Sequence, residues 1–436
     1  MRGPRIGWLL GIAWLVGLGV LPAAGEAPAV SRTTLPNGLT VLVRENPAAP
    51  VVAISLAVRM GTRWEARETA GISNFLQLMV VRGTTSRNGI QIVEDAERMG
   101  GSIDAVGKVD WSEISADGLS RHWAGLLDLV ADVVLHPSLP PGLVDAVRRF
   151  LQRQVRNRGE RPYHVAFDTL LGSLFGSHPY AWHPIGRRES LARLDRDALL
   201  AHYRRHYVPG GIVLAVSGRV RAPEVFAEVK RLFGKIPPAS SPRPPAVRPP
   251  EAEASREVRE VPGAQAQIFV GAFAPTLKHP DYPAVKVLGA LLGGGMASRF
   301  FSELRDKQAL AYYTGTRYSP LTDTGYFISE LGTAPENLAR AEGALMRELD
   351  RIRREPPTAA EVRVAKAYLL GRFAMDRRTN ARRAQELATY ELAGVGQGFV
   401  DRYIAAVKAV TPADVQRVAQ TYLKTVRVSI AEPPAQ

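Results

Sequence analysis

Apolar and polar positions follow the same order in two long stretches of the chain. In the first, VVAISLAVRM at 51–60 has the pattern of a buried strand, and GISNFLQLMV at 71–80 is an apolar run with helical spacing. In the second, QIFVGAFAP at 267–275 precedes the apolar run AVKVLGALLGG at 284–294. The pattern therefore predicts a strand followed by a helix, twice in one chain.

The later segments of the two stretches repeat as well. Paired strands followed by helices are predicted at 101–156 in the first and at 310–373 in the second, with prolines where the helices begin. Each stretch closes with a helix and a buried strand, and Tyr207 and Tyr422 occupy matching places 215 residues apart. This order predicts two homologous α+β domains, each a mostly antiparallel sheet with helices packed on it.

A proline-rich segment lies between the two stretches. The sequence PPASSPRPPAVRPP at 237–250 has seven prolines in fourteen residues. Such a segment cannot form a helix or a central strand and favours an extended, semi-rigid connector. We therefore expect an N-terminal domain at 29–236, a linker at 237–256 and a C-terminal domain at 257–436, joined into a clamshell.

The beginning of the chain predicts export. Residues 1–25 combine two early arginines, an apolar run from Ile6 to Leu21, and small residues where a signal peptidase would cut. The run is short for a membrane span, and an uncleaved membrane anchor is the alternative. We expect a periplasmic or secreted protein, with association to the membrane left open.

Composition narrows the chemistry that the chain can perform. Its 436 residues are 46% hydrophobic, which is enough for sizeable cores in two domains. There is no cysteine, which excludes disulfides, thiolate nucleophiles and cysteine-bound zinc. The net charge is +14, yet the arginines are scattered and no basic motif is interleaved with aromatic residues. The charge thus indicates a basic solvated surface, and we expect no nucleic-acid partner.

The stretch MGTRWEARETAGISNFLQLMVVRGT at 60–84 resembles the first signature of the insulinase and pitrilysin family of zinc metallopeptidases. In that family the helix carries H-x-x-E-H, whose two histidines lie one helical turn apart and bind zinc while the glutamate activates a water molecule. Here the three positions hold Asn74, Gln77 and Leu78. An amide is a poor zinc ligand, leucine is none, and glutamine has no carboxylate to accept a proton.

The family's third zinc ligand is a glutamate on a later helix. By the resemblance, Gln154 in QRQVRNRGERP occupies that place, 76 residues after Leu78. All four positions of the metal centre are therefore changed, and we expect this chain to bind no zinc and no other cofactor of its own.

Two other interpretations of these segments remain open. GISNFLQLM could be an ordinary core helix, because apolar helices are common, although the flanking resemblance disfavours this. His202 and His206 lie four residues apart on a predicted helix and could hold a metal, but no acidic residue follows at ligand-like spacing. A capping or surface role is the simpler expectation for this pair.

The segment GGGMASRFFSELRDKQALAYYTGTRY at 293–318 resembles the family's C-terminal signature, in which an arginine and a tyrosine seven residues apart lie over the substrate. Arg305 and Tyr312 have this spacing. The resemblance implies that Tyr312 stabilises the oxyanion and that Arg305 orients the peptide through charge-assisted hydrogen bonds. The alternative is structural: an arginine at a helix C-terminus and a tyrosine that begins a strand.

This chain has lost the metal motif and retained the Arg/Tyr pair. In this combination it is similar to one subunit of the family's two-subunit bacterial peptidases. The resemblance implies a heterodimer in which a homologous subunit holds the zinc and this chain supplies the pair across the interface. Substrate would be a peptide or unfolded protein that adds as a strand to a sheet edge. The candidate substrate-binding residues are Ser102, Ile103, Asp104, Ala105, Gly294 and Gly295, and Asp104 stands where the family often has asparagine.

Three hypotheses follow from these observations. The first is a partner subunit, inert alone, of a zinc endopeptidase. The second is a peptide-binding or scaffold protein of a periplasmic or membrane complex. The third is an independent hydrolase with a different centre, which no G-x-S-x-G or comparable motif supports.

Overall fold

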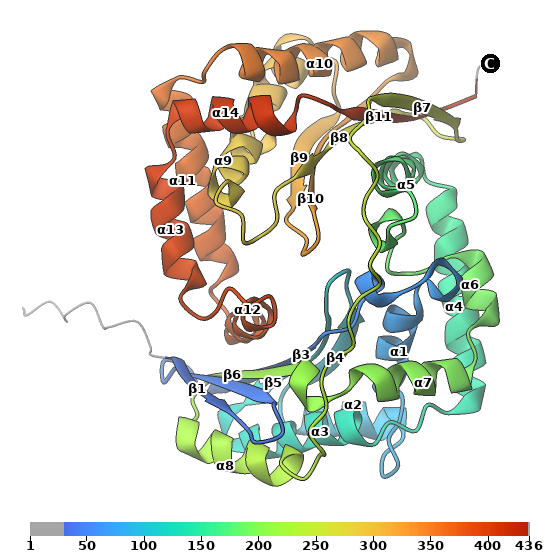
Figure 1. Cartoon of the computed structure of the whole chain (residues 1–436), viewed down its shortest axis with the longest axis vertical. Helices are drawn as coiled ribbons and strands as arrows, with labels where there is room; N and C mark the ends of the chain where they lie inside the picture. Colours follow the sequence, from blue (N-terminus) through green and yellow to red (C-terminus); the bar gives the residue numbers. More distant parts are fainter. Residues whose placement is uncertain (1–29, 435–436) are drawn as a thin grey trace, which may run out of the picture.

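The computed structural model describes residues 30–434, so the predicted signal peptide at 1–25 lies outside the described residues. Two β-sheets dominate the architecture (Figure 1). One sheet is built from the first half of the described chain and the other from the second half. Within residues 30–434, none of the helices combines the length and the apolarity that a membrane crossing requires.

The N-terminal sheet has six strands in the order β1-β2-β6-β3-β5-β4. Its strands are β1 Val30–Thr34, β2 Thr40–Glu45, β3 Val51–Val58, β4 Ser102–Gly107, β5 Ser112–Leu119 and β6 Ile212–Gly218. Only β2 and β6 pair in parallel, and the other neighbours are antiparallel. The strand β4 therefore forms one edge of this sheet.

The C-terminal sheet repeats this topology with five strands in the order β7-β11-β8-β10-β9. Its strands are β7 Ser255–Glu260, β8 Ala266–Ala274, β9 Tyr313–Ser319, β10 Gly325–Thr333 and β11 Arg427–Glu432. Again one pair is parallel, β7 with β11, and the rest are antiparallel. The starts of β3 and β8, and of β6 and β11, are each 215 residues apart. The fold is thus the duplicated α+β architecture that the pattern predicts, and β9 is the counterpart of β4.

Helices pack on each sheet to form two main hydrophobic cores. The first half contains α1 Ile72–Val80, α2 Gly89–Arg98, α3 Trp123–Leu135, α4 Pro141–Gly159, α5 Pro162–Phe175, α6 Arg188–Arg193, α7 Arg196–His206 and α8 Ala222–Phe233. The second half contains α9 Tyr282–Gly293, a π-helix Phe301–Lys307, α10 Leu338–Arg354, α11 Ala359–Asp376, α12 Asn380–Leu392, α13 Phe399–Ala409 and α14 Pro412–Tyr422. Proline in the first turn of α4, α5 and α14 marks helix starts.

Each half lends one helix to the other half's sheet (Figure 1). The N-terminal α5 packs on strands β8 and β11, where Phe167 and Leu170 meet Phe269 in a small core. The C-terminal α12 packs on β3 and β6, where Ala384 and Ala388 are fully buried. Both faces of both sheets are therefore covered, and the exchange joins the halves through two apolar interfaces.

The linker follows the surface between the halves as an extended chain with neither helix nor strand from 237 to 254. It is pinned at its start, because the Ala239 carbonyl accepts from Gly210 N at 3.0 Å and the Pro242 carbonyl accepts from Trp64 Nε1 at 3.1 Å. Near its end, the guanidinium of Arg427 donates to the carbonyls of Glu251 and Glu253. These bonds hold the linker near both of its ends.

A polar clamp connects the β4–β5 turn of the first half to the β9–β10 turn of the second. Arg63 donates two hydrogen bonds to Asp323, at 2.8 and 2.5 Å. Asp110 accepts from Tyr180 Oη and from both the backbone N–H and the hydroxyl of Thr322. Burial alone would raise the pKa of Asp323, but hydrogen bonds from His178 and Arg63 outweigh it and hold that pKa well below its usual value. The clamp therefore favours the ionised carboxylate of Asp323, whereas burial raises the pKa of Asp110.

Candidate functional site

Helix α1 carries the sequence that resembles the zinc motif, and a buried carboxylate holds its first turn. Glu65 accepts hydrogen bonds from the backbone N–H groups of Gly71 at 2.7 Å and Ser73 at 3.0 Å. Burial raises the pKa of Glu65, while these two bonds act in the opposite direction. Gly71 has φ +92°, and a Cβ there would lie 2.5 Å from Gly186 Cα, so only glycine fits.

The four motif positions lie on α1 and α4 in different surroundings. Gln77 is fully buried; its Nε2 donates to Tyr207 Oη at 2.9 Å and its Oε1 has no hydrogen-bond partner. Asn74 and Leu78 are partly exposed, and Leu78 also packs against the core. Gln154 is exposed on α4. The Gln77 amide is thus committed to the packing between α1 and the end of α7, a role that the sequence alone did not reveal.

These residues do not fit a zinc ion. Zinc in proteins takes imidazole, thiolate or carboxylate ligands, and the four positions offer three amides and a hydrocarbon. Within residues 30–434 there is no group of three His, Asp or Glu side chains arranged to hold a metal ion. The Oε1 atom of Gln77, which has no hydrogen-bond partner, is a single weak metal ligand inside a packed interface and cannot replace the missing ligands.

The pair His202 and His206 lies on α7 against α1 and makes protein contacts. His202 Nε2 is 3.1 Å from Ser73 Oγ, and His206 Nδ1 is 3.0 Å from the carbonyl oxygen of Arg59. A carbonyl only accepts, so Nδ1 of His206 carries the proton. Burial lowers the pKa of His206 to about 4 and lowers that of His202 well below its usual value. Both rings are therefore neutral packing elements at neutral pH.

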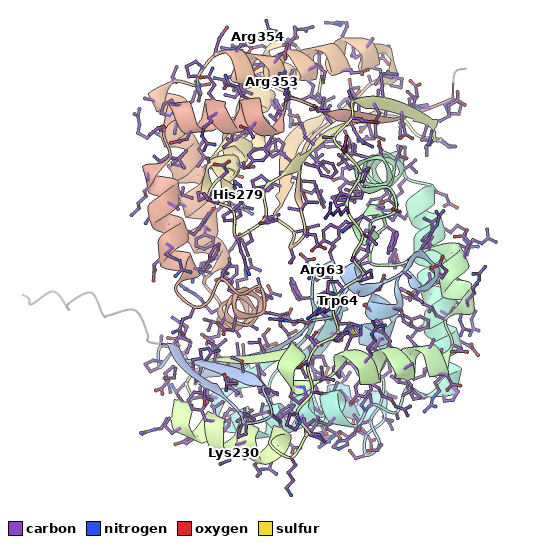
Figure 2. All side chains as sticks on the ribbon, viewed as in Figure 1. Arg63, Trp64, Lys230, His279, Arg353 and Arg354 are labelled. Atoms are coloured by element: carbon purple, nitrogen blue, oxygen red, sulfur yellow. The ribbon has the colours of Figure 1, made fainter. Side chains whose placement is uncertain are left out.

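The two histidines predict acid sensitivity. Their pKa values are lower in the folded protein than the ordinary value of 6.5, so the unfolded chain binds protons first as the pH falls. The free energy of unfolding should thus decrease from pH 7 to pH 5, by about 2 kcal/mol for His206 alone. Urea unfolding at the two pH values measures this. His202→Gln should reduce the change in the free energy of unfolding between the two pH values. His279→Gln, at the exposed His279 (Figure 2), should not reduce it. An equal change in both variants would contradict the assignment.

Strand β4 presents a free edge beside α1. Lys108 N donates to Trp111 O at 2.9 Å, and successive residues of an antiparallel pair alternate between bonding the partner and facing away from it. Counting back along β4, the backbone groups of Ile103, Ala105 and Gly107 face outward. The N–H of Ala105 is indeed bonded to the carboxylate of Asp104, at 2.8 Å. A peptide adding to this edge must first displace that carboxylate.

A large groove with a volume of about 1160 Å³ borders this edge. Its walls come from β4, the end of α1, the following loop, α2 and the start of α4. Three aliphatic side chains in its lining are unusually exposed: Ile90 by 71%, Val93 by 49% and Leu143 by 39%. Leu78, at the place of the family's second histidine, also lines it. The groove therefore joins a degenerate motif position to the predicted substrate-binding residues Ile103, Asp104 and Ala105.

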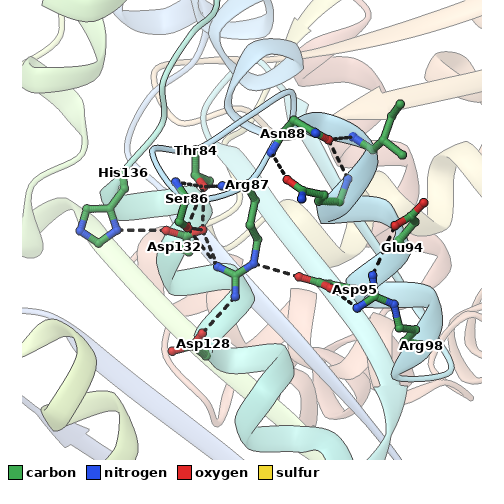
Figure 3. Close-up of polar contacts among 12 residues, drawn as sticks. Thr84, Ser86, Arg87, Asn88, Glu94, Asp95, Arg98, Asp128, Asp132 and His136 are labelled. Carbon is green, nitrogen blue, oxygen red and sulfur yellow. Dashed lines mark hydrogen bonds and ion pairs between the residues drawn. The ribbon is translucent and has the colours of Figure 1, made fainter.

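Arg87 and its carboxylate partners connect the loop at one wall of the groove to α2 and α3 (Figure 3). Its guanidinium contacts Asp95 at 2.9 Å and Asp132 at 2.6 Å, and Asp128 at 3.6 Å. Burial alone would raise the pKa of Asp132, but hydrogen bonds from Thr84, Arg87 and Ser86 hold it below its usual value. The charge of Arg87 is thus compensated inside the protein.

Substituting Gly107 should disturb this site. A Cβ at Gly107 would lie 2.6 Å from Asn74 Cα and 2.8 Å from Asn74 N, and backbone atoms cannot move aside easily. We expect Gly107→Ala to lower the free energy of unfolding by about 1–3 kcal/mol, because α1 must separate from β4. Gly142→Ala is the control, since nothing lies within 4 Å of a Cβ there and it should be neutral or slightly stabilising. Equal stabilities in chemical denaturation would contradict the close packing.

Arg305 and Tyr312 are both exposed in the second half. Arg305 lies on the π-helix with its guanidinium 4.9 Å from the ring of Phe301, and Tyr312 is 56% exposed just before β9. Between them, Ala309 adopts φ +52°, an uncommon conformation for a residue other than glycine. Neither side chain lines the groove at β4 or the cavity between the halves described below. Their orientation toward a substrate stays a prediction.

Gly294 and Gly295 lie directly after α9. A Cβ at Gly294 would lie 2.4 Å from the Ala290 carbonyl oxygen, and Gly295 has φ +123° with the ring of Tyr368 against it. Both therefore have a backbone reason to be glycine where the helix ends, and they also line a small cavity that the exposed Met296 borders. A contact with substrate stays a prediction.

Two sheets of matching topology, exchanged helices and a motif helix beside a strand edge define a duplicated peptidase-like α+β protein. Residues 40–186 match the family model described as Insulinase (Peptidase family M16), and residues 193–369 match the model described as Peptidase M16 inactive domain. The chain belongs to this insulinase family, peptidase family M16.

Relatives and solved structures agree with this assignment. A protein of Mycobacterium bovis named an uncharacterized zinc protease is 28% identical over 395 residues, covering 90% of each chain. A Bacillus subtilis protein of the same description is 25% identical over 342 residues, covering 78% of this chain and 83% of the relative.

The fold is similar to that of two solved structures. One is the crystal structure of a peptidase M16 inactive domain from Pseudomonas fluorescens, with a TM-score of 0.87, 21% identity, and coverage of 93% of this chain and 98% of that chain. The other is a protease from Helicobacter pylori, with a TM-score of 0.87, 21% identity, and coverage of 94% and 100%.

Proposed function

We propose that this protein is the non-catalytic subunit of a heterodimeric zinc endopeptidase of the insulinase family. One observation carries the proposal: on α1 the ligand positions hold Asn74, a poor zinc ligand, and Leu78, which is none, yet the edge of β4 and its groove are open beside them. A chain that had lost both catalysis and peptide binding would have no need of an open edge next to exposed aliphatic side chains. The zinc ion would belong to a homologous partner subunit.

The residues of this chain would act on the substrate in two places. An extended peptide or unfolded segment would add to β4 through main-chain hydrogen bonds to Ile103 and Ala105. Such bonds depend little on the amino-acid sequence of the bound peptide. Arg305 and Tyr312 would reach the partner's substrate across the interface, with the guanidinium orienting the peptide and the phenol donating a hydrogen bond to the oxyanion. We further propose that the protein works after export, in the periplasm or outside the cell.

Purification and reconstitution test this function. The isolated chain should contain less than about 0.1 zinc ion per molecule, measured by inductively coupled plasma mass spectrometry. It should also cleave no unfolded-protein substrate. Adding a homologous subunit with an intact H-x-x-E-H should give chelator-sensitive cleavage and a 1:1 complex in size-exclusion chromatography. Chelator-sensitive cleavage by this chain alone would reject the proposal.

A second candidate is a peptide-binding or scaffold protein with no part in catalysis. The groove itself favours it, because a strand edge with adjacent aliphatic side chains can bind a peptide without any reacting group. In that case Arg305→Ala and Tyr312→Phe leave the activity of any partner unchanged, while substitutions in the groove still weaken peptide binding.

A further inference from the structure

A second cavity lies between the two halves of the chain and has no part in the proposed function. Its volume is about 710 Å³, within the range of small-molecule sites. The first half, the second half and the linker segment 241–244 all contribute to its lining. Figure 2 shows two of its lining residues, Arg63 and Trp64, in the middle of the molecule, where the linker crosses between the halves. The cavity thus exists only in the folded two-domain chain.

Most of the charged side chains that line this cavity are basic. Its lining contains Arg59, Arg63, Lys108, Arg243 and Lys278, against a single carboxylate, Asp110. The carboxylate of Asp110 already accepts hydrogen bonds from Tyr180 and Thr322 in the clamp. The carboxylate of Asp323 compensates the charge of Arg63.

The remaining charges are not neutralised. Within residues 30–434, the guanidinium of Arg59 donates a single hydrogen bond, to the carbonyl oxygen of Leu392. Among residues 30–434, no ion pair or side-chain hydrogen bond involves Lys108, Arg243 or Lys278. Arg59, Lys108, Arg243 and Lys278 are all exposed around this cavity. Several positive charges around one cavity without a counter-charge create a favourable potential for an anion.

Aromatic rings stand beside these cations. Trp64, Trp111 and Tyr390 belong to the same lining. The indole of Trp64 is fixed by its hydrogen bond to the Pro242 carbonyl and carries the guanidinium of Arg63 at 5.2 Å from its ring. Fixed aromatic faces bind planar apolar groups with little loss of conformational entropy. The cavity therefore offers cations for a charged group and rings for a flat one.

We propose that this cavity binds a small aromatic anion, a flat ring system that bears a carboxylate, sulfonate or phosphate. The anionic group lies toward Lys108 and Lys278, and the ring packs against the tryptophans. Because both halves and the linker line the cavity, a bound anion also stabilises the folded two-domain chain.

The probe for this site is 8-anilinonaphthalene-1-sulfonate, an aromatic anion whose fluorescence rises on binding. We expect one saturable site on the folded protein, and an affinity at least tenfold weaker in the double variant Lys108→Ala/Lys278→Ala. The control is Lys230→Ala/Lys424→Ala, which removes two exposed lysines outside the cavity and should bind as the unaltered protein does. Figure 2 labels the first of them, Lys230. Far-ultraviolet circular dichroism verifies that each variant is folded.

A neutral probe separates charge from apolar binding. N-phenyl-1-naphthylamine has the same rings without the sulfonate, and its affinity should be low and equal in all three proteins. Equal affinity for the sulfonate in the cavity variant and the control, or several independent sites on the unaltered protein, would overturn the proposal. This outcome is independent of the reconstitution experiment, because it needs no partner subunit and no cleavage.

Discussion

Replacing Tyr312 by phenylalanine should lower kcat of the reconstituted peptidase about 100-fold while the complex still assembles. The variant removes one hydroxyl, and in the proposed function that hydroxyl donates to the oxyanion as charge develops. Loss of a single donor of this kind typically costs a factor of 10² to 10³ in rate. Tyr312 is 56% exposed, so removing its hydroxyl leaves the core of the subunit intact.

The measurement is steady-state cleavage of an unfolded substrate at saturating partner, with the complex quantified by size-exclusion chromatography. Tyr368→Phe is the control, because Tyr368 is also exposed, by 43%, and lies on α11. Arg305→Ala should raise KM more than it lowers kcat if the guanidinium orients the peptide, and Arg363→Ala on α11 is its matched control. Unchanged kcat in Tyr312→Phe, with normal assembly, would favour the scaffold function.

Introducing a carboxylate at Ala388 should destabilise the whole chain by about 3–5 kcal/mol. Ala388 is fully buried where α12 lies on β3 and β6, in a cluster that includes Ala57 and Ala215. These alanines let the helix backbone approach the sheet, and no partner for a charge lies among them. A carboxylate without a partner is strongly unfavourable there, so Ala388→Asp should separate α12 from the N-terminal sheet.

Ala381→Asp is the matched control on the same helix. Ala381 is exposed in the first turn of α12, where a negative charge interacts favourably with the helix dipole. Urea unfolding should show a reduced midpoint for Ala388→Asp and an unchanged or slightly higher midpoint for Ala381→Asp. Similar midpoints for the two variants would mean that the exchanged helix contributes little to stability.

The repeated pattern of the sequence predicted most of the fold, because it depends on local periodicity. The apolar runs at 51–60 and 267–275 became β3 and β8, and the prolines before 144 and 359 lie at the start of α4 and just before α11. The same reasoning could not predict which sheet each helix covers. The contacts of α12 with β3 join residues more than 300 positions apart, and no local pattern encodes such a pairing.

The candidate site divides in the same way. The sequence revealed the changed motif positions, and it placed Ile103 and Ala105 on a strand that is indeed an edge. It missed the groove, although Ile90 and Val93 on α2 were a signal, since two aliphatic residues three apart form a stripe on one helix face in addition to the buried Ile92. It also missed the bond between Gln77 and Tyr207, since the two residues are 130 positions apart.

The amino-acid sequence by itself determined which atoms are available: no thiolate, no ligand set on α1, and an excess of positive charge. Those properties belong to single residues and do not depend on neighbours. The tertiary structure decided where these atoms act, by exchanging α5 and α12 between the halves and by bringing basic and aromatic side chains of both halves to one cavity beside the linker. The physical reason is that burial, the pairing of charges and the shape of a cavity arise from contacts between distant residues, which form only when the whole chain packs.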